Sequence, residues 1–319
     1  MFYVLSDSFN PYYNLASEEY LLKNFAENIF MLWRSEPAVI VGKHQNALAE
    51  LNYPYLLKNK LHVARRLSGG GTVVHDLNNL NFTFIANGEP GKLIDFKKFV
   101  APIMEYLATL GIKAHIGKTN DIRIGELKVS GNAEHVYKKR VLHHGTLLFN
   151  SDLEQLREAI KVTPGKYIDK AVQSNRASVT NIHSLLDTKM TIQEFTNGLV
   201  AFILKNYGYK PYTLSPADTK QITALCEEKY ASWDWIWGYS PKYSFTNSFM
   251  IQNNQWNVKF EVEKSIIKTA EILLNNKQLH TKVILEEIRH QKPDLKAAFQ
   301  NLTTQLGIDN LESFLNNLF

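Results

Sequence analysis

The residues with the clearest chemical potential form the segment RRLSGGGTVVHD, residues 65–76. Two arginines and a leucine precede Ser68 and three consecutive glycines, and a β-branched run follows them. Glycines adopt positive φ without a steric penalty and let a ligand approach the main chain. A row of backbone amides beside an arginine then matches the oxygens of a phosphate or a carboxylate. The segment predicts an anion-binding loop that leads into a strand, with a flexible hairpin carrying solvated arginines as the alternative.

Familiar glycine-loop motifs do not fit this segment. It has neither the G-x-x-x-x-G-K-[ST] spacing of NTPases nor the G-x-G-x-x-G that opens a helix in dinucleotide-binding folds. Ser68 is not a hydrolase nucleophile, because a nucleophile elbow needs a glycine two residues earlier and Arg66 stands there. We expect Ser68 to donate a hydrogen bond instead.

Lys128 and two adjacent histidines offer further chemistry. Lys128 lies on a predicted strand, and the turn at Ser130 and Gly131 exposes backbone donors beside its ammonium. A solvated surface lysine is the alternative. His143 and His144 must point to opposite faces of a strand, so only one of them lines a given pocket. Because no cysteine or carboxylate cluster completes a tetrahedral set, the pattern favours a core or substrate-packing histidine over a metal ligand.

Periodicity and turn residues predict the elements that position these groups. A helix is expected over residues 14–25 with Asn14 or Ser17 as its cap, and residues 29–33 and 38–41 are expected to form a β-hairpin. Such short strands with occasional helices predict an α+β fold with a mixed, largely antiparallel sheet rather than a doubly wound one. Further strands are expected at residues 81–85, 114–116, 121–124, 126–129 and 141–149, and further helices at residues 96–110 and 191–207.

The remaining segments suggest a second, smaller domain. Residues 165–181 are polar and without periodicity, which is typical of a functional or mobile loop. The tryptophan-rich residues 233–241 are interpreted as a core or domain-junction plug. A strand pair at residues 256–262 and 265–274 follows, so we place the domain boundary near Thr246, with a catalytic domain over 1–246 and a small domain over 247–319.

Composition limits the class of protein. A chain of 319 residues with 45% hydrophobic and 21% charged residues is typical of a globular protein of about two domains. The N-terminus lacks a signal peptide pattern, and no segment approaches the ~20 apolar residues of a membrane span. The single cysteine, Cys226, forms no internal disulfide and has no activating cation nearby, so we expect an inert thiol and a cytoplasmic protein. The scattered net charge of +5 indicates neither a nucleic acid nor a membrane partner.

Several motifs together resemble lipoate–protein ligases. Residues 10–16, 65–76, 120–121, 128–133 and 143–147 occur in that family's order, and the match spans most of the first 250 residues. Residues 174–181 resemble the family's adenylate-binding loop and residues 233–241 its domain junction, whereas residues 250–319 hold only a loose echo of its accessory domain. The resemblance implies a catalytic domain of the type shared with biotin protein ligases, plus a small C-terminal α/β accessory domain.

The resemblance also implies a reaction. ATP activates free lipoate to lipoyl-AMP, and a lysine of a lipoyl domain of a 2-oxoacid dehydrogenase complex, or of glycine cleavage H protein, then takes the lipoyl group. Lys128 would bridge the acyl oxygen and the α-phosphate as the key catalytic residue, by electrostatic stabilisation. Asn120 and Asp121 would contact ribose or Mg²⁺, with Asp121 as the metal ligand. Residues 165–181 would close over the adenylate as a lid.

Site residues follow motif by motif. The resemblance assigns ATP and lipoyl-adenylate to Arg66, Ser68, Gly69, Gly70, Gly71, Thr72, Val73, Val74, His75, Asn120, Asp121, Lys128, Ser130, Gly131, Ala133, Ser174, Arg176 and Val179. It assigns the lipoate pocket to Trp33, Arg66, Gly71, Asn81, His144 and Gly145, with Val74 and His75 in the apolar wall.

Three alternatives remain open. A biotin-type ligase is disfavoured because such enzymes carry a Gly-Arg-Gly-Arg motif that this chain lacks. An octanoyl or lipoyl transferase would need a cysteine, and Cys226 lies outside every motif. A binding module without turnover, or a lipoate sensor, would not need Lys128.

Overall fold

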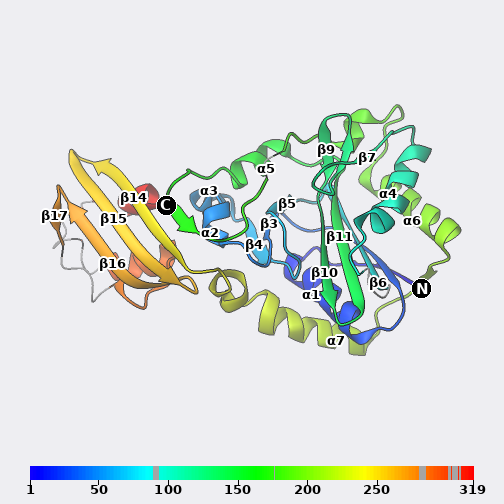
Figure 1. Cartoon of the computed structure of the whole chain (residues 1–319), viewed down its shortest axis with the longest axis horizontal. Helices are drawn as coiled ribbons and strands as arrows, with labels where there is room; N and C mark the ends of the chain where they lie inside the picture. The colour runs from blue at the N-terminus through cyan, green and yellow to red at the C-terminus, as the bar shows by residue number, and fades with distance from the viewer. Residues whose placement is uncertain (89–92, 176, 280–284, 301–302, 304–307, 309) are drawn as a thin grey trace. The chain divides into compact units, whose positions relative to one another are not determined.

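The computed structural model describes residues 1–88, 93–175, 177–279, 285–300, 303, 308 and 310–319 (Figure 1). The chain forms two compact units. The first comprises Met1–Lys43, Leu61–Arg157 and Ser174–Ser232, and the second comprises His44–Lys60, Glu158–Gln173 and Trp233–Phe319. The predicted division after residue 246 falls inside strand β14 (Tyr243–Ile251), and the assignment of catalysis to residues 1–246 stays a prediction.

A six-stranded mixed sheet organises the first unit. Its order is β10-β11-β6-β2-β1-β13, with antiparallel pairing from β10 to β2 and parallel pairing from β2 to β13. The predicted mixed, largely antiparallel α+β fold is confirmed. The strands are β10 (Asn132–Tyr137), β11 (Arg140–Leu148), β6 (Asn79–Asn87), β2 (Ile29–Trp33), β1 (Phe2–Leu5) and β13 (Lys210–Pro211).

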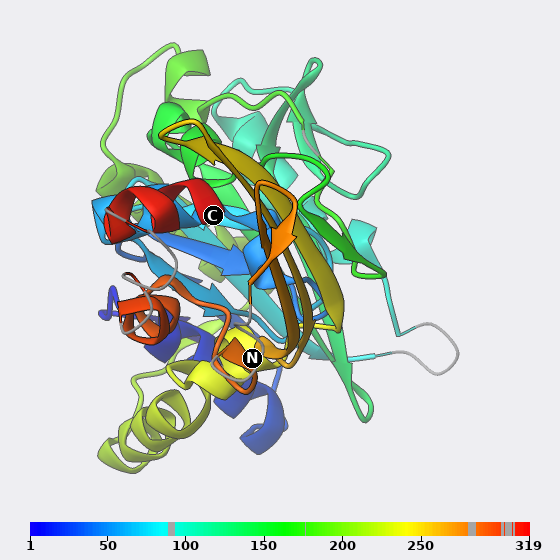
Figure 2. The same cartoon turned by 90° about the vertical axis from the view of Figure 1, so that its left-hand side faces the viewer.

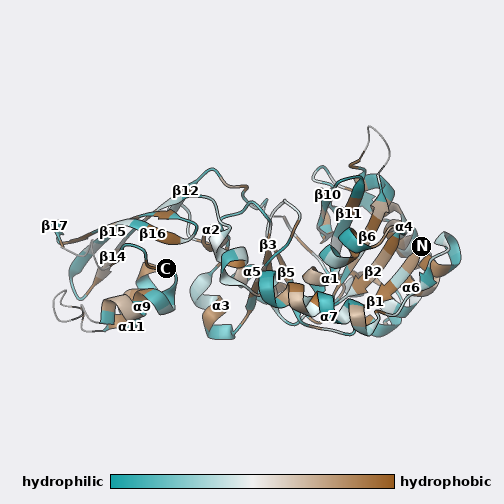
Figure 3. Ribbon diagram, turned by 90° about the horizontal axis from the view of Figure 1, so that it is seen from below, coloured by the Kyte–Doolittle hydropathy of each residue, from teal (hydrophilic) through white to brown (hydrophobic). Residues whose placement is uncertain are grey.

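Helices α4 (Phe96–Thr109) and α6 (Ile192–Tyr207) cover one face of this sheet (Figure 1). Aromatic side chains of β2 and β6 pack there against Phe99 and Phe195, which builds the main core. α6 begins in a capping box of Thr191 and Glu194 and ends at Gly208 with φ of 69°. Its ribbon carries both apolar and polar residues, as an amphipathic helix must (Figure 3).

Helix α1 (Pro11–Asn24) contacts the opposite face. The predicted start at residue 14 is wrong, because Asn10 is the cap: its side chain accepts hydrogen bonds from the amides of Tyr12 and Tyr13. Pro11 then occupies the first turn, where it needs no amide hydrogen. Asn14 is buried instead and donates to the main-chain oxygens of Ser8 and Arg34.

Two three-stranded sheets complete the strands of the first unit. One has the order β4-β3-β5 and the other β7-β8-β9. The hairpin predicted for residues 29–33 and 38–41 is wrong, because β2 pairs with β1 and β6 whereas β3 pairs with β4 and β5. The bounds are β3 (Ala38–Val41), β4 (His62–Arg65), β5 (Val73–His75), β7 (His115–Ile116), β8 (Ile122–Ile124) and β9 (Leu127–Ser130).

Shorter helices belong to both units. They are α2 (Ala47–Glu50), α3 (Tyr53–Asn59), α5 (Leu153–Ala159), the 3₁₀ helix η1 (Ile182–Leu185), α7 (Pro216–Leu225) and the π-helices η2 (Cys226–Tyr230) and η3 (Asp234–Gly238). In the first unit, Glu19 of α1 accepts hydrogen bonds from Lys229 and from the hydroxyl of Tyr230. This ties η2 to α1.

The second unit is built on a five-stranded antiparallel sheet, order β12-β14-β15-β16-β17. Helices α9 (Lys292–Gln300) and α11 (Leu311–Leu318) lie on one side of it (Figure 2). The tryptophan-rich segment packs inside this unit, where Trp233 donates to Gln291. The remaining strands are β12 (Tyr167–Asp169), β15 (Asn254–Glu263), β16 (Ile266–Leu274) and β17 (Lys277–Gln278).

Asp218 gives the first unit a pH-dependent contact. Burial raises the pKa of its carboxyl, but hydrogen bonds from Tyr20, Ser215 and Tyr212 outweigh that effect and hold the pKa at about 2. The folded value lies below the unfolded value of about 3.9, so this stabilisation is present above pH ~4 and is lost as the pH falls towards 2.

Replacing Asp218 with Asn is therefore expected to lower the free energy of unfolding at pH 7 by about 1–3 kcal/mol. The difference from the parent should shrink as the pH approaches 2. Urea unfolding at pH 7, 4 and 2.5 measures it, with the exposed Asp7→Asn as control. A difference that stayed constant with pH would contradict the role of the ionised carboxylate.

Candidate active site

The glycine loop runs from β4 to β5 and is held by the main chain that follows β3. The amide of Arg66 donates to the carbonyl of Val41, and the amide of Lys43 donates to the carbonyl of Ser68. Gly70 has φ of 83°, a conformation that favours glycine. The predicted strand after the loop is confirmed as β5.

Both arginines before the loop are buried and bind main-chain oxygens. Arg65 donates to the carbonyls of Gly42 and Lys43. Arg66 donates from Nε to Ser68 Oγ, from Nη1 to Ile40, and from Nη2 to the carbonyls of Gly69 and Gly71. The alternative of solvated arginines is wrong. The guanidinium of Arg66 shapes the loop from beneath, and its predicted contact with an anion stays a prediction.

Gly42 is required by this packing. A Cβ there would lie 2.1 Å from the carbonyl oxygen of Gly70 and 3.2 Å from Arg66 Nη2. Gly42→Ala is expected to destabilise the protein by about 1–3 kcal/mol, because the loop backbone has to move. Thermal unfolding measures the loss. Gly69→Ala is the matched control, since a Cβ at Gly69 meets nothing within 4 Å. Equal stability of the two variants would contradict this account.

The face of the large sheet that contacts α1 carries a row of polar and aromatic side chains. Trp33 pairs with Asn81, and Thr83 pairs with His144, so all four share one face. His75 of β5 lies with its ring centroid 5.3 Å from that of Trp33. These residues lie together as a wall, and Ala133 of β10 shares their face, whereas Val74 is the strand neighbour of His75 and points to the opposite side of β5. That an acyl chain binds along this wall stays a prediction.

Two buried polar atoms in this wall lack a hydrogen-bond partner among the described residues, namely Asn81 Nδ2 and His75 Nδ1. Burial, together with the positive charge of Arg66, lowers the pKa of His75 to about 3, so its imidazole is neutral at pH 7. Unpaired buried groups of this kind are typical of a site completed by water or a ligand.

Gly145 and His143 lie on the opposite face, in the main core. The expectation that only one histidine of the pair lines a pocket is confirmed by the pairing register. His143 stacks on Phe99 and hydrogen-bonds with Glu134. A Cβ on Gly145 would collide with Phe82, so this glycine, assigned to the lipoate pocket, serves packing through its missing side chain.

Lys128 on β9 lies beside the glycine loop. Its Nζ is 3.3 Å from the position a Cβ would take at Gly131, and Val73 lies next to that same position. Burial lowers the pKa of the Lys128 ammonium, the carboxylate of Asp121 opposes this, and Arg123 and Arg66 add to it. Among the described residues none forms a hydrogen bond with this ammonium. A cation without such a partner suits an anionic ligand.

The segment from Ser174 to Asn181 reaches the same place. The main chain of Lys128 donates to Ser178 and accepts from Thr180, with a parallel bridge between Lys128 and Val179. Ser174 Oγ accepts from the amide of Thr72 at 2.8 Å and lies close above Gly71. The lack of regular structure expected for residues 165–181 is wrong at one end, because β12 forms there. Arg176 lies outside the described residues.

Asp121 was expected to bind Mg²⁺. Its carboxylate is 1% exposed and accepts hydrogen bonds from Thr119 Oγ1 and Arg123 Nε. In the described ranges no three His, Cys, Asp or Glu side chains group as metal ligands. These contacts do not fit a carboxylate poised for Mg²⁺. Asn120, with φ of 59°, accepts from Asn132 through its main-chain oxygen, and Ser130 Oγ donates to Asn132.

Sequence reasoning missed Gly42 and two members of the wall, Glu18 and Thr83. Glu18 is 2% exposed and accepts hydrogen bonds from Thr83 Oγ1 and His144 Nδ1. The sequence offered one signal for Glu18, namely a charged residue on the apolar side of the predicted helix. Its partners lie 65 and 126 positions away, so spacing could not identify them.

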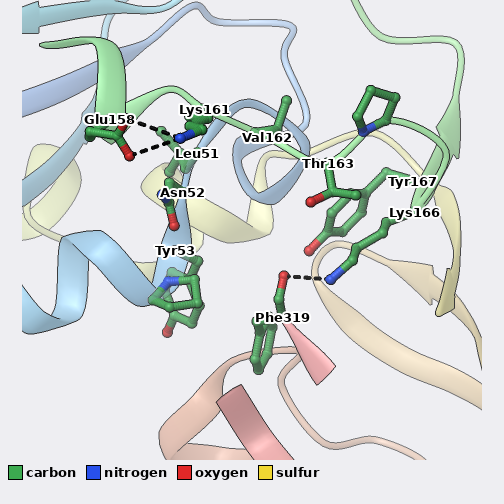
Figure 4. A pocket seen from close by; sticks show the side chains of 12 residues that line it. Leu51, Asn52, Tyr53, Glu158, Lys161, Val162, Thr163, Lys166, Tyr167 and Phe319 are labelled. Carbon is green, nitrogen blue, oxygen red and sulfur yellow. Dashed lines mark hydrogen bonds and ion pairs between the residues drawn. The ribbon is translucent and has the colours of Figure 1, made fainter. Parts of the chain in front are cut away.

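A cavity of about 390 Å³ lies within the second unit, between α3, the segment after α5 and Phe319 (Figure 4). Lys166 Nζ donates there to the main-chain oxygen of Phe319, and Lys161 pairs with Glu158. None of the residues assigned to ATP or lipoate lines it.

In the described part of the chain, no helix has both the length and the apolar character needed to cross a membrane.

Comparison with known proteins shows the family of this chain. The family model described as "Lipoyl protein ligase A/B catalytic domain" matches residues 10–203. Lipoate–protein ligase 1 of Staphylococcus aureus is 38% identical over 265 residues, which cover 82% of this chain and 81% of the relative. Lipoate–protein ligase LplJ of Bacillus subtilis is 35% identical over 320 residues, which cover 94% and 96%.

Solved structures give the same result. LipL1 of P. falciparum in complex with lipoate aligns with a TM-score of 0.65 at 25% identity, covering 99% of this chain and 97% of its own. A lipoate–protein ligase A bound with ATP aligns with a TM-score of 0.65 at 26% identity, covering 75% and 98%. The bipartite ligase of Thermoplasma acidophilum, reported with its E2 lipoyl domain, aligns with a TM-score of 0.63 at 26% identity, covering 75% and 96%. By sequence and fold, the chain belongs to the lipoate–protein ligase family.

Proposed function

We propose that this protein activates free lipoate with ATP and transfers the lipoyl group to a lysine of a lipoyl domain. The names and bound ligands of its relatives support this reaction. The single observation that carries it is the ammonium of Lys128, which stands beside the glycine loop without a hydrogen-bond partner among the described residues.

The reaction needs activation, because a carboxylate and an ammonium form a salt rather than an amide. A carboxylate oxygen of lipoate attacks the α-phosphorus of ATP, and the bond to pyrophosphate breaks. The amine of the acceptor lysine then attacks the acyl carbon of lipoyl-AMP, and AMP leaves as the amide forms. Magnesium, carried by the triphosphate, would shield charge in the first step.

Lys128 offsets the repulsion between the incoming carboxylate and the triphosphate. Its ammonium then stabilises the charge that grows on the α-phosphate oxygens, a preorganised electrostatic effect that is often the largest in catalysis. The amides of the glycine loop contribute further donors, and Arg66 keeps them in place from beneath. No covalent intermediate with the enzyme is needed.

The acyl chain of lipoate would lie along the wall of Trp33, His75 and His144. Burying about eight carbons at roughly 0.8 kcal/mol each gives on the order of 6 kcal/mol, enough for micromolar binding once polar contacts are added. A neutral His75 suits this apolar neighbour, because no charge has to be desolvated when the chain binds.

The segment around Ser174 would act as the lid. It covers Gly71 and hydrogen-bonds with Thr72, so it can exclude water from a hydrolysable anhydride. We expect ATP plus lipoate to slow protease cleavage within residues 170–177 several-fold, measured by mass spectrometry of the fragments. Equal cleavage with and without both substrates would contradict the lid.

The acceptor and the compartment are also proposals. A lipoyl domain of an E2 subunit is the acceptor that the archaeal ligase structure supports, and glycine cleavage H protein is the second acceptor to test. A lone cysteine suits the reducing cytoplasm. Burial raises the pKa of the Cys226 thiol, which disfavours the transferase alternative because a thioester requires a reactive thiolate.

Two measurements test the function. Pyrophosphate release is expected on mixing the protein with Mg-ATP and lipoate, and not with biotin. Mass spectrometry should then show a lipoyl mass gain on one lysine of an E2 lipoyl domain, and the same assay with octanoate and with H protein defines the specificity. Lipoate binding without pyrophosphate release would favour the binding module.

A further inference from the structure

A chain of buried hydrogen bonds connects the acyl-binding wall with the glycine loop. It begins at Trp33 Nε1, which donates to Thr83 Oγ1 at 3.2 Å, and Thr83 donates to the carboxylate of Glu18 at 2.5 Å. Both Glu18 oxygens lie 3.0 Å from His144 Nδ1. His144 Nε2 is 2.6 Å from Ser68 Oγ, which accepts from Arg66 Nε. The chain therefore ends on the arginine that holds the loop.

The partners fix where each hydrogen lies. The carboxylate of Glu18 can only accept, so His144 Nδ1 carries a ring hydrogen, and the hydroxyl of Ser68, whose Oγ accepts from Arg66 Nε, has His144 Nε2 as its acceptor. His144 Nε2 is then the acceptor, and its ring carries the hydrogen on Nδ1, directed at Glu18. A carboxylate can only accept, which makes this tautomer the one that satisfies every member.

We propose that Glu18 is a positioning residue for the ligase reaction, acting on the glycine loop through the tautomer of His144, Ser68 and Arg66. The inference rests on the proposed function for the step it serves. Glu18 touches neither reacting group. It keeps Ser68 aligned under Arg66, whose Nη2 fixes the carbonyls of Gly69 and Gly71 and with them the directions of the loop amides.

Small displacements matter at such a loop, because a shift of about 1 Å in a positioned group can cost about 100-fold in rate. The neighbouring Glu19 provides the contrast. It is equally buried on α1, but it accepts from Lys23, Lys229 and Tyr230, whereas Glu18 accepts from Thr83 and His144. Comparing variants of the two carboxylates therefore distinguishes a positioning role of Glu18 from a general contribution to the stability of α1.

The experiment compares Glu18→Gln with Glu19→Gln in the full chain. Glu18→Gln is expected to reduce kcat for lipoate-dependent pyrophosphate release about 10- to 100-fold, the effect of losing one hydrogen bond to a charged group. Its glutamine amide can donate to Nδ1, so ¹⁵N NMR should show the His144 hydrogen move from Nδ1 to Nε2. Glu19→Gln should change neither kcat nor the His144 signal, even where its melting temperature falls as far.

A second variant keeps the test independent of folding. Ser68→Ala breaks the same chain at its other end, and the double variant Glu18→Gln with Ser68→Ala should lose no more activity than the worse single variant. The proposal would be overturned if the losses of activity in the two single variants multiplied in the double variant. It would also be overturned if kcat of Glu18→Gln were within threefold of the parent value, or if NMR placed the His144 hydrogen on Nε2 in the parent.

Failure of the proposed function is separable from failure of this inference. If the parent released no pyrophosphate with lipoate, the positioning role of Glu18 would still be tested by the His144 tautomer, measured by NMR, and by the affinity for ATP, measured by calorimetry. Glu18→Gln should then weaken ATP binding about tenfold while Glu19→Gln does not, and equal affinities would overturn the positioning role.

Discussion

Lys128→Ala is expected to reduce lipoyl-AMP formation by about 10²- to 10³-fold while leaving the fold intact. The ammonium forms no hydrogen bond with a described residue, so its removal leaves no protein acceptor unpaired. The lost charge is felt only where anions meet, in the attack of lipoate on the α-phosphorus. Single-turnover pyrophosphate release measures the effect, and urea unfolding checks the fold.

Lys128→Arg is the matched control. It keeps the charge, but it replaces a compact ammonium with a planar guanidinium on a stem of different length, so the charge is placed differently toward the anion. Partial activity is expected, between that of the parent and of Lys128→Ala. Full activity of Lys128→Ala would remove this residue from the catalytic step and leave the binding-module alternative as the better account.

Arg66→Ala is expected to lower the free energy of unfolding by about 3 kcal/mol or more, together with the loss of adenylate formation. Arg66 is 5% exposed, and its guanidinium donates to three carbonyls and one hydroxyl, all of which would lose this donor. Burial lowers its pKa to about 10, so the charge persists at pH 7. Urea unfolding and pyrophosphate release measure the two effects.

Arg140→Ala provides the comparison for Arg66. Arg140 also donates to main-chain carbonyls, those of Ala26 and Glu27, but these bonds are exposed to water. Its loss should cost about 1 kcal/mol or less and leave adenylation unchanged. An Arg66→Ala protein as stable as the parent would show that the loop does not depend on this guanidinium.

Much of the local structure could be predicted from the sequence. The ranges of β2 and β3 follow from their apolar, β-branched runs. Their pairing could not be predicted, because β2 is buried throughout and accepts neighbours on both edges, whereas a hairpin needs them to pair with each other. Local composition specifies a strand better than it specifies its partners.

The site shows the same division. Motifs identified the loop and Lys128, but the direction of Arg66 depends on carbonyls supplied by Ile40 and the loop itself. The role of Glu18 could not be predicted for a related reason, since nothing in the sequence of its helix indicates a hydrogen bond with a histidine 126 positions away. Position in a motif predicted which residues gather, and only the fold could say which of them face a ligand.

The hydrogen bond between Ser174 and the amide of Thr72 sets up a competition. One amide hydrogen serves one acceptor well, so a phosphate oxygen that takes it must first displace Ser174. The measured ATP affinity is then the intrinsic affinity reduced by the fraction of molecules in which this amide is already released. A stronger bond between Ser174 and Thr72 would keep the segment around Ser174 closed for longer. The enzyme would then retain lipoyl-AMP better but bind ATP less readily, so the strength of this one hydrogen bond affects both steps in opposite directions.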